Sequence, residues 1–399
     1  MSKVEFITLM AMLMALNALA IDIMLPGLQQ IGESLGVESE NHRQYIISAY
    51  LLGFAIAQLV FGPLADRFGR RGPLLVGLGI YIVAAFAGAV APTFTGLLIM
   101  RFVHGIGSAA TRVITVSIIR DVFGGRQMAE AMSLIMMVFM IVPVIAPGTG
   151  QIIMLFAEWH MIFVFMGLAS IVVAIWMAIR LPETLNPADK RLLNIGSIFQ
   201  AFRVVLTNRI ALCYTLASTF IFGALFGFIN SAQQIYVGIY KLGTMFPVVF
   251  AGVAGFMALS SYMNSRLVGR FGMRRLSHGA LLGFIGVNSI WFLLSLFGTL
   301  PLWLFLLLFT LAMFQFGLIG SNFNSLAMEP LGHVAGTASS VLGFMGTAGG
   351  GAIGALIGQA YDGTTMPLAL GFFSVAIIGL FFVLIAERGK LFQAHHKPL

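Results

Sequence analysis

The chain carries very little charge and almost no cysteine. Asp, Glu, Lys and Arg make up 9% of its 399 residues, whereas a soluble domain has about 25%. The mean hydropathy is +0.98, so a water-exposed surface of ordinary polarity is excluded. The single cysteine, Cys213, excludes a disulfide framework and any metal site built from several thiolates. These absences indicate a protein embedded in lipid.

Long apolar runs take the place of the missing charge. A helix needs about 20 apolar residues to cross a bilayer, and the period-two alternation of membrane β-strands is absent. We predict an all-α membrane protein with twelve transmembrane helices in two pseudo-symmetric six-helix bundles. The predicted spans are 6–25, 44–61, 73–91, 96–119, 132–156, 160–180, 209–231, 244–265, 277–297, 301–322, 336–358 and 366–386.

The basic residues alternate in sidedness along these spans. If the N-terminus is cytoplasmic, all but four of the 22 Lys and Arg residues fall in cytoplasmic segments. The exceptions are Arg43 and Lys241 outside, and Arg101 and Arg112 within a span. This positive-inside pattern predicts a multi-pass protein with both termini in the cytoplasm. The net charge of +8 therefore reflects topology, and nucleic acid is not an expected partner.

The chain divides at its longest polar connection. We predict an N-terminal bundle over 1–181, a cytoplasmic linker over 182–208 and a C-terminal bundle over 209–399. Residues 195–209 are apolar and basic, and they are expected to lie on the membrane surface as an amphipathic helix. Residues 1–20 resemble a signal peptide, but cleavage would leave eleven spans and break the charge alternation. We therefore interpret them as part of a retained first span.

A basic motif between the second and third spans recurs in the second half. Arg67-Phe-Gly-x-Arg71 aligns with Arg270-Phe-Gly-x-Arg274, 203 residues later. Such repeats are typical of transporters. The first copy contains Asp66, where the second has Gly269, so the two copies are not functionally equal.

Charged residues within a bilayer are costly and are functional candidates by default. Asp22 follows Glu5 by seventeen residues, about 25 Å along a helix, and Arg101 precedes Arg120 by nineteen, about 28 Å. Both therefore lie at similar depth, and we predict that they pair across the first and fourth spans in proton coupling. The alternatives are a water-exposed helix-end acid for Asp22 and a structural clamp for Arg101.

Two further groups on the fourth span are candidates for a substrate cavity. Arg112 lies about three helical turns after Arg101 on nearly the same face, where it can meet an anionic substrate or can snorkel to the membrane surface. His104 lies one turn from Arg101 and can relay protons, although a lone histidine in a span is more often a packing residue.

The fifth span and the second half supply the other candidates. Pro143, Pro147 and Gly150 interrupt the fifth span, either as a pivot or as a simple kink. No acid occurs between Asp189 and Glu329. The second half therefore offers neutral polar groups for the cavity, among them Asn230 and Gln234, and proton handling belongs to the first half.

These motifs resemble the major facilitator superfamily, and more narrowly the bicyclomycin-resistance (Bcr/CflA) type of drug–proton antiporter. The resemblance covers almost the whole chain. The family usually has Gln in place of His104 and a small residue in place of Arg112. The matching motifs are Gly62-x-Leu-x-Asp-Arg-x-Gly-Arg-Arg71, Arg101-Phe-Val-His-Gly-Ile-Gly107, Pro143-x-x-Ala-Pro147-x-x-Gly150 and Asp22-x-x-Leu-Pro26.

The resemblance implies how the protein works. Two bundles rock around a central cavity, and a gating motif closes the cytoplasmic side, with Asp66 bonding near a helix end of the second half. The gating residues are Gly62, Asp66, Arg67, Gly69, Arg70 and Arg71.

The expected function is proton-coupled multidrug efflux of small, mostly hydrophobic compounds from the bacterial cytoplasmic (inner) membrane. The alternative within the same fold is a proton-coupled or facilitative importer of one metabolite. An intramembrane enzyme is not expected, because the His residues are scattered, and neither is a sensor. The expected partners are a small-molecule substrate, protons and membrane lipid, with no cofactor and no metal, and the protein is expected to be a monomer.

Overall fold

The structure is a computed structural model that describes residues 1–123, 125–189 and 195–392. Every regular element within these residues is a helix, because a helix satisfies its backbone hydrogen bonds internally where lipid offers none. Eleven of the described helices are long and apolar enough to cross a bilayer. A shorter apolar stretch, Ile141–Phe156, lies in the 32-residue helix α6 and accounts for the twelfth crossing. The predicted fold is confirmed.

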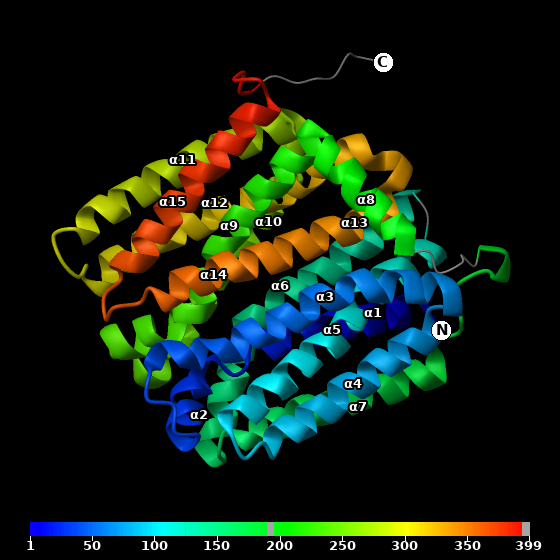
Figure 1. Ribbon diagram of the computed structural model, residues 1–399, viewed down its shortest axis with the longest axis horizontal. Coiled ribbons are helices and arrows are strands. Elements are labelled where there is room, and N and C mark those ends of the chain that lie inside the picture. The colour runs from blue at the N-terminus through cyan, green and yellow to red at the C-terminus, as the bar shows by residue number, and fades with distance from the viewer. Residues whose placement is uncertain (124, 190–194, 393–399) are drawn as a thin grey trace. The chain divides into compact units, whose positions relative to one another are not determined.

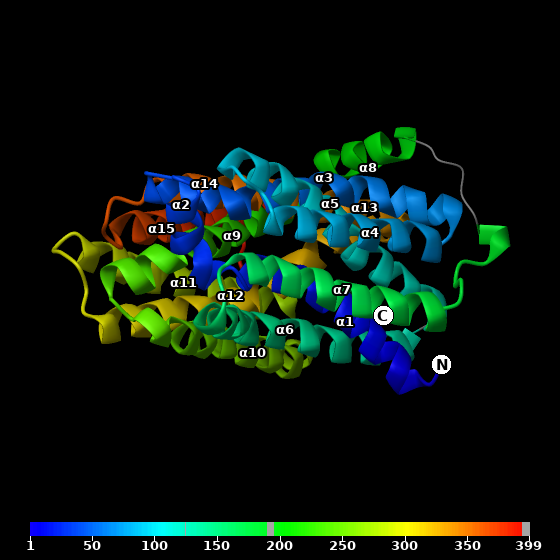
Figure 2. The same ribbon diagram turned by 90° about the horizontal axis from the view of Figure 1, so that it is seen from below.

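Unit 1 comprises Met1–Gly196 and Thr244–Val248. In this unit α5 packs mainly on α3 and α4, and α1 contacts α5, α6 and α7; Figure 2 shows α1 beside α6 and α7. Its helices are α1 (Lys3–Asp22), α2 (Leu28–Ser34), α3 (Tyr45–Phe68), α4 (Arg71–Ala89), α5 (Phe94–Val122), α6 (Gly125–Phe156) and α7 (His160–Arg180).

Unit 2 comprises Ser197–Gly243 and Val249–Leu399. Its central helix α9 packs on α12, α14 and α15, and Figure 1 shows α14 alongside α9. From the start of α8 onward the helices are α8 (Ile195–Thr207), α9 (Arg209–Gln233), α10 (Phe246–Phe271), α11 (Met273–Ser295), α12 (Leu302–Met328), α13 (Ala335–Phe344), α14 (Gly350–Gln359) and α15 (Met366–Ala386).

Several helices begin at residues whose side chains complete the first turn. Ser2 Oγ accepts a hydrogen bond from the N–H of Glu5 at 3.2 Å, and Thr93 Oγ1 accepts one from Gly96 at 3.1 Å. Asn208 Oδ1 accepts a bond from Ala211 at the start of α9. The first N–H groups of a helix have no partner within it, so these caps set where α1, α5 and α9 start.

The two turns that the sequence aligned have similar backbones. Gly69 between α3 and α4 has a φ of 95°, and Gly272 between α10 and α11 has a φ of 79°. Helix α3 continues to Phe68, so the first seven residues of the Gly62–Arg71 motif are helical. The sequence analysis ended this span at residue 61 and assigned the whole motif to the connection. The observed turn is much shorter.

Candidate functional site: the polar face of α5 and the helix ends around it

Polar side chains follow one face of α5. They recur at intervals of three or four residues, which places them above one another on a helix. All except Arg112 are buried. The members of this polar face are Arg101, His104, Ser108, Arg112 and Thr115.

Arg101 is fully buried and binds the backbone of two neighbouring helices. Its Nη2 donates to the carbonyl oxygen of Ala20 on α1 at 2.9 Å, and its Nε donates to the carbonyl oxygen of Ile46 on α3 at 3.2 Å. The guanidinium carbon lies 4.5 Å from the centre of the Tyr50 ring. Because Ala20 is in the last turn of α1, its carbonyl lacks a helical partner, and a cation is favourable at that end. Arg101 therefore ties α1 and α3 to α5.

His104 accepts the third hydrogen bond that Arg101 donates. Nη1 of Arg101 lies 3.1 Å from Nδ1 of His104. A guanidinium only donates hydrogen bonds, so Nδ1 accepts and the ring proton is on Nε2. Nε2 has no hydrogen-bond partner among the described residues, and the ring meets Tyr81 edge-on at 4.0 Å. His104 is thus neutral in this arrangement.

Asp22 makes no hydrogen bond or ion pair with Arg101 among the described residues. It is the last residue of α1 and is 4% exposed, and its Oδ1 has no hydrogen-bond partner within the described part of the chain. The guanidinium instead binds Ala20, two residues earlier. In this conformation the guanidinium binds the free carbonyl at the end of α1, and the pairing of Asp22 with Arg101 stays a prediction.

Hydrogen bonds that the sequence analysis missed complete this cluster. Tyr50 donates to Ser108 Oγ at 2.7 Å, and Asn17 Nδ2 lies 3.2 Å from the same oxygen. Tyr81 donates to the carbonyl oxygen of Leu16 at 3.1 Å. A signal for Asn17 existed, since it interrupts an apolar run, and Ser108 follows Arg101 at helical spacing. The partners themselves come from different spans and were not predictable.

Arg112 differs from Arg101 in having no polar partner among the described residues. Its side chain is half-buried, and its guanidinium carbon lies 5.9 Å from the centre of the Phe54 ring on α3. One turn later, Thr115 is fully buried, and its Oγ1 has no partner among the residues described.

The proline–glycine motif of α6 meets the end of α1. Pro143 and Pro147 lie inside α6. Gly150 packs against the backbone of Ile23, where a Cβ atom would overlap the Ile23 carbonyl oxygen. Since Ile23 follows Asp22, the motif lies next to the acid that the sequence analysis chose on separate grounds.

The gating motif forms an ion-pair network at the C-terminal ends of α3 and α5. Arg70 Nη1 lies 2.6 Å from Asp66 Oδ1, and its Nε lies 2.7 Å from Asp121 Oδ2. Burial acts to lower the pKa of Arg70, but the bonds to Asp121 and Asp66 outweigh it and raise the pKa above its usual value. The family resemblance implied a bond from Asp66 to the second half, whereas here Asp66 pairs within its own turn.

Glu183, just after α7, completes this network. Its carboxylate accepts the backbone N–H groups of Arg70 at 2.8 Å and Arg71 at 3.1 Å. A Cβ atom at Gly69 would collide with this carboxylate, so the turn needs glycine for space as well as for its positive φ. Arg71 donates to the carbonyl oxygen of Ala178 at 2.5 Å.

Two members of the gating motif take no part in the network. Gly62 lies inside α3, and Arg67 is exposed near the end of that helix. The contacts of the motif in this network therefore involve Asp66, Gly69, Arg70 and Arg71.

Unit 2 contains a related network that the sequence analysis did not predict. Arg274 binds Glu387 at 2.8 Å and Glu329 at 2.9 Å, and Tyr214 donates to Glu387 at 2.7 Å while its oxygen lies 2.9 Å from His278 Nε2. Burial acts to raise the pKa of Glu387, but the bonds from Tyr214 and Arg274 hold it below its usual range. The second half thus compensates for Gly269 with acids from other helix ends.

The proposed cavity residues of unit 2 lie around a π-helical segment. Asn230 on α9 is 1% exposed, and neither atom of its amide has a hydrogen-bond partner in the described ranges. Gln234 is buried and begins the π-helical residues Gln234–Ile239. Such interruptions are frequent at functional sites.

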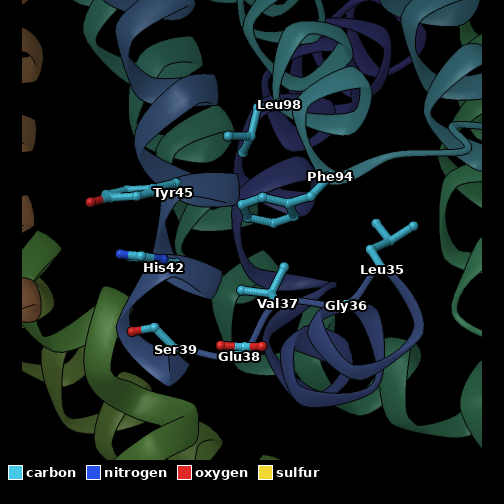
Figure 3. A pocket seen from close by; sticks show the side chains of 9 residues that line it. All are labelled: Leu35, Gly36, Val37, Glu38, Ser39, His42, Tyr45, Phe94 and Leu98. Carbon is cyan, nitrogen blue, oxygen red and sulfur yellow. The ribbon is translucent and has the colours of Figure 1, made fainter.

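An open pocket of about 510 Å³ lies at the end of unit 1 where α3 and α5 begin. Figure 3 shows its lining, which comes from the segment after α2 and from the first turns of α3 and α5. None of the predicted site residues lines it. Its lining residues are Leu35, Gly36, Val37, Glu38, Ser39, His42, Tyr45, Phe94 and Leu98.

The chemistry available in the described spans is that of isolated acids, bases and amides. Within the described residues, no group of three or more His, Cys, Asp or Glu side chains is arranged to hold a metal ion. The arrangement offers a buried carboxyl group at Asp22 that can bind and release a proton, a fixed positive charge at Arg101 and polar atoms for a small molecule.

Comparison with known proteins relates the whole chain to membrane transporters. A family model for the Major Facilitator Superfamily matches residues 10–355. The uncharacterised MFS-type transporter YdgK of Bacillus subtilis is 33% identical over 390 residues, 95% of each chain. A bicyclomycin resistance protein homolog from Haemophilus influenzae is 29% identical over 364 residues, 91% of each chain.

The fold also matches a solved structure, an inward-facing bacterial homolog of the human lysosomal transporter Spinster. The TM-score is 0.73 at 16% identity, over 97% of this chain and 96% of that one. Together these matches confirm the resemblance read from the motifs. They also show a multi-pass membrane transporter of small molecules that is not an enzyme.

Proposed function

Because the chain belongs to the major facilitator superfamily, we propose that it is a proton-coupled multidrug exporter. In this proposal it expels small, mostly hydrophobic compounds by alternating access in exchange for protons. Support for efflux comes from the relationship to a bicyclomycin resistance protein homolog.

The observation that carries the proton coupling is the state of Asp22. A buried carboxylate is costly unless it is paired or neutral, and Oδ1 of Asp22 has no partner among the described residues. Arg101 binds the carbonyl oxygen of Ala20 in the last turn of the same helix. In this proposal, a rotation of the end of α1 relative to α5 exchanges Ala20 for Asp22 as the partner of Arg101. That exchange favours release of the proton and couples protonation to helix movement.

Helix α6 supports the movement. Its Gly150 contacts the backbone next to Asp22, and its two prolines remove helical hydrogen bonds at 143 and 147. We propose that α6 bends there when the end of α1 shifts. His104 accepts a hydrogen bond from Nη1 of Arg101. It thereby holds Arg101 in the position in which Arg101 does not bind Asp22.

We further propose the arrangement of the chain in the membrane. Residues 1–181 and 209–399 form the two bundles that rock, joined by a cytoplasmic linker over 182–208. The site is the bacterial cytoplasmic (inner) membrane with both termini inside, and the working unit is a monomer in contact with lipid. The positive-inside distribution of Lys and Arg supports this topology.

Proteoliposomes with a pH-sensitive dye inside test the proposal. Addition of bicyclomycin or ethidium is expected to release protons through the wild-type protein, and Asp22→Asn is expected to abolish this release while drug binding and the melting temperature are kept. Glu158→Gln is the matched control, because Glu158 is an exposed acid outside the spans. Full drug-driven proton flux in Asp22→Asn would remove Asp22 from the mechanism.

The same vesicles test the alternative of an importer of one specific metabolite. An exporter moves several unrelated drugs in the direction opposite to the protons, which flow down their gradient. An importer transports one class of metabolite down or with the gradient and ignores the drugs. The neutral amides of unit 2, such as Asn230, suit either kind of substrate, so direction and breadth of transport decide between them.

A further inference from the structure

We propose that Arg112 and Thr115 form a subsite for the anionic group of small aromatic substrates, such as aryl carboxylates or sulfonates. The inference rests on the proposed function only in that the protein transports small compounds. It adds a substrate class that the family relationship does not assign, namely organic anions within a mostly hydrophobic set.

The first observation is that Arg112 has no counter-charge in the part of the chain that the structure describes. It is half-buried inside a 29-residue helix, and no ion pair or hydrogen bond joins its guanidinium to the described residues. Arg101 by contrast makes three polar contacts, and Arg70 and Arg274 each bind two carboxylates. The charge of Arg112 is thus available to a ligand.

The acids of unit 1 near the helix ends are already engaged. Asp66 and Asp121 bind Arg70, and Glu5 binds Arg180. Asp22 lies at a different depth, since Arg112 is eight residues before Arg120, about 12 Å from the cytoplasmic edge, and Asp22 is about 25 Å from it. The potential around Arg112 is therefore positive, and such a field attracts anions.

The second observation is a buried hydroxyl one turn away. Thr115 is fully buried, and its Oγ1 has no partner among the described residues. A helical threonine commonly bonds to a carbonyl of the preceding turn, as Thr111 does to Ser108 at 2.8 Å. Thr115 does not make this bond, so its O–H can donate to a bound anion.

The third observation is the aromatic neighbour. Phe54 lies 5.9 Å from the guanidinium carbon of Arg112. A guanidinium binds a carboxylate or sulfonate through parallel N–H bonds, and Phe54, which is 2% exposed, places an aromatic ring beside that charge. Charge, hydroxyl and ring together select an aryl anion over an inorganic ion or a neutral compound.

Counterflow in proteoliposomes tests this subsite with two probes of nearly equal size, dansyl-glycine and the neutral dansyl-glycinamide. Counterflow needs no proton gradient, so it is independent of the Asp22 proposal. Arg112→Ala is expected to raise the KM for dansyl-glycine about tenfold or more, because a charge-assisted bond is lost. The KM for dansyl-glycinamide is expected to stay within about twofold of the wild-type value. Arg112→Lys is expected to have a KM for dansyl-glycine between those of the wild type and Arg112→Ala. Thr115→Val is expected to raise the KM for dansyl-glycine by a smaller factor than Arg112→Ala.

Arg120→Ala is the matched control, because Arg120 is an exposed arginine at the end of the same helix. Equal losses for both probes in Arg112→Ala would show a structural role and overturn the subsite. No change for either probe, or no transport of dansyl-glycine by the wild type, would overturn it as well. An anionic lipid headgroup shares the same chemistry, so a charge effect found only with anionic lipid and lost in phosphatidylcholine vesicles would assign Arg112 to lipid instead.

Discussion

Replacing Glu183 with alanine is expected to destabilise the end of unit 1 where α3, α5 and α7 end and α4 begins. The carboxylate accepts the first N–H groups of α4, from Arg70 and Arg71, across more than a hundred residues of sequence. It also accepts the N–H groups of Thr184 and Leu185 at 3.0 Å each. Glu183 is therefore a helix cap supplied by a distant segment, with a charge that suits the N-terminus of a helix.

The size of the effect follows from this geometry. Replacing a capping side chain with alanine costs about 0.5–2 kcal/mol. Bonds to a charged group are stronger than this, but the side chain is exposed and water replaces part of the loss, so we expect about 1–2 kcal/mol. For a unit of roughly 200 residues, that corresponds to a fall in the melting temperature of about 2–8 °C.

The pH dependence gives a second, independent signature. Desolvation acts to raise the pKa of Glu183, but the four backbone N–H bonds outweigh it, so the pKa in the folded protein lies below its usual value. Such a group stabilises the fold above the unfolded pKa, near 4.3, and loses this contribution as the pH falls through the folded value. The difference between wild type and Glu183→Ala is therefore expected to be constant from about pH 5.5 to 8 and to shrink below about pH 4.3.

Thermal melts of the purified protein in detergent, followed by intrinsic fluorescence, measure both signatures. Glu183→Gln retains one acceptor oxygen, so its melting temperature is expected to lie between those of the wild type and Glu183→Ala. Glu38→Ala is the control, because Glu38 is an exposed acid near α2 for which no comparable cap exists. A melting temperature unchanged by Glu183→Ala at pH 7, or a gap that widens on acidification, would refute the reasoning.

Two further predictions concern transport. Asp66→Ala is expected to lower turnover in liposomes and to keep drug binding in detergent, because Arg70 retains Asp121; loss of binding with an intact fold contradicts a gating role. Gly150→Ala places a methyl group against the Ile23 carbonyl. It is expected to lower the free energy of unfolding by about 1–3 kcal/mol and to remove most of the proton-coupled flux. Gly79→Ala in α4, where a Cβ atom meets nothing within 4 Å, is its control, and equal behaviour of the two variants counts against the α1–α6 contact.

The sequence by itself determined the membrane fold and the family. Hydropathy and the distribution of Lys and Arg are local properties, so they predict spans without knowledge of partners. The repeated Arg-Phe-Gly-x-Arg turn was also readable, since the positive φ of Gly69 and Gly272 depends on the residue itself. Asp22, Arg101 and Arg112 stood out because a charge within an apolar run is rare.

Only the tertiary structure decided which groups these charges meet. Arg101 binds the carbonyl of Ala20 and Nδ1 of His104 rather than Asp22, because the end of α1 leaves a carbonyl unpaired where the guanidinium arrives.

Glu183 and Glu387 looked like ordinary acids after a span, yet each accepts bonds from a helix start more than a hundred residues away. A side chain's depth in the membrane follows from its position in one helix. Its partner depends on how several helices pack, and no single span of the sequence records that.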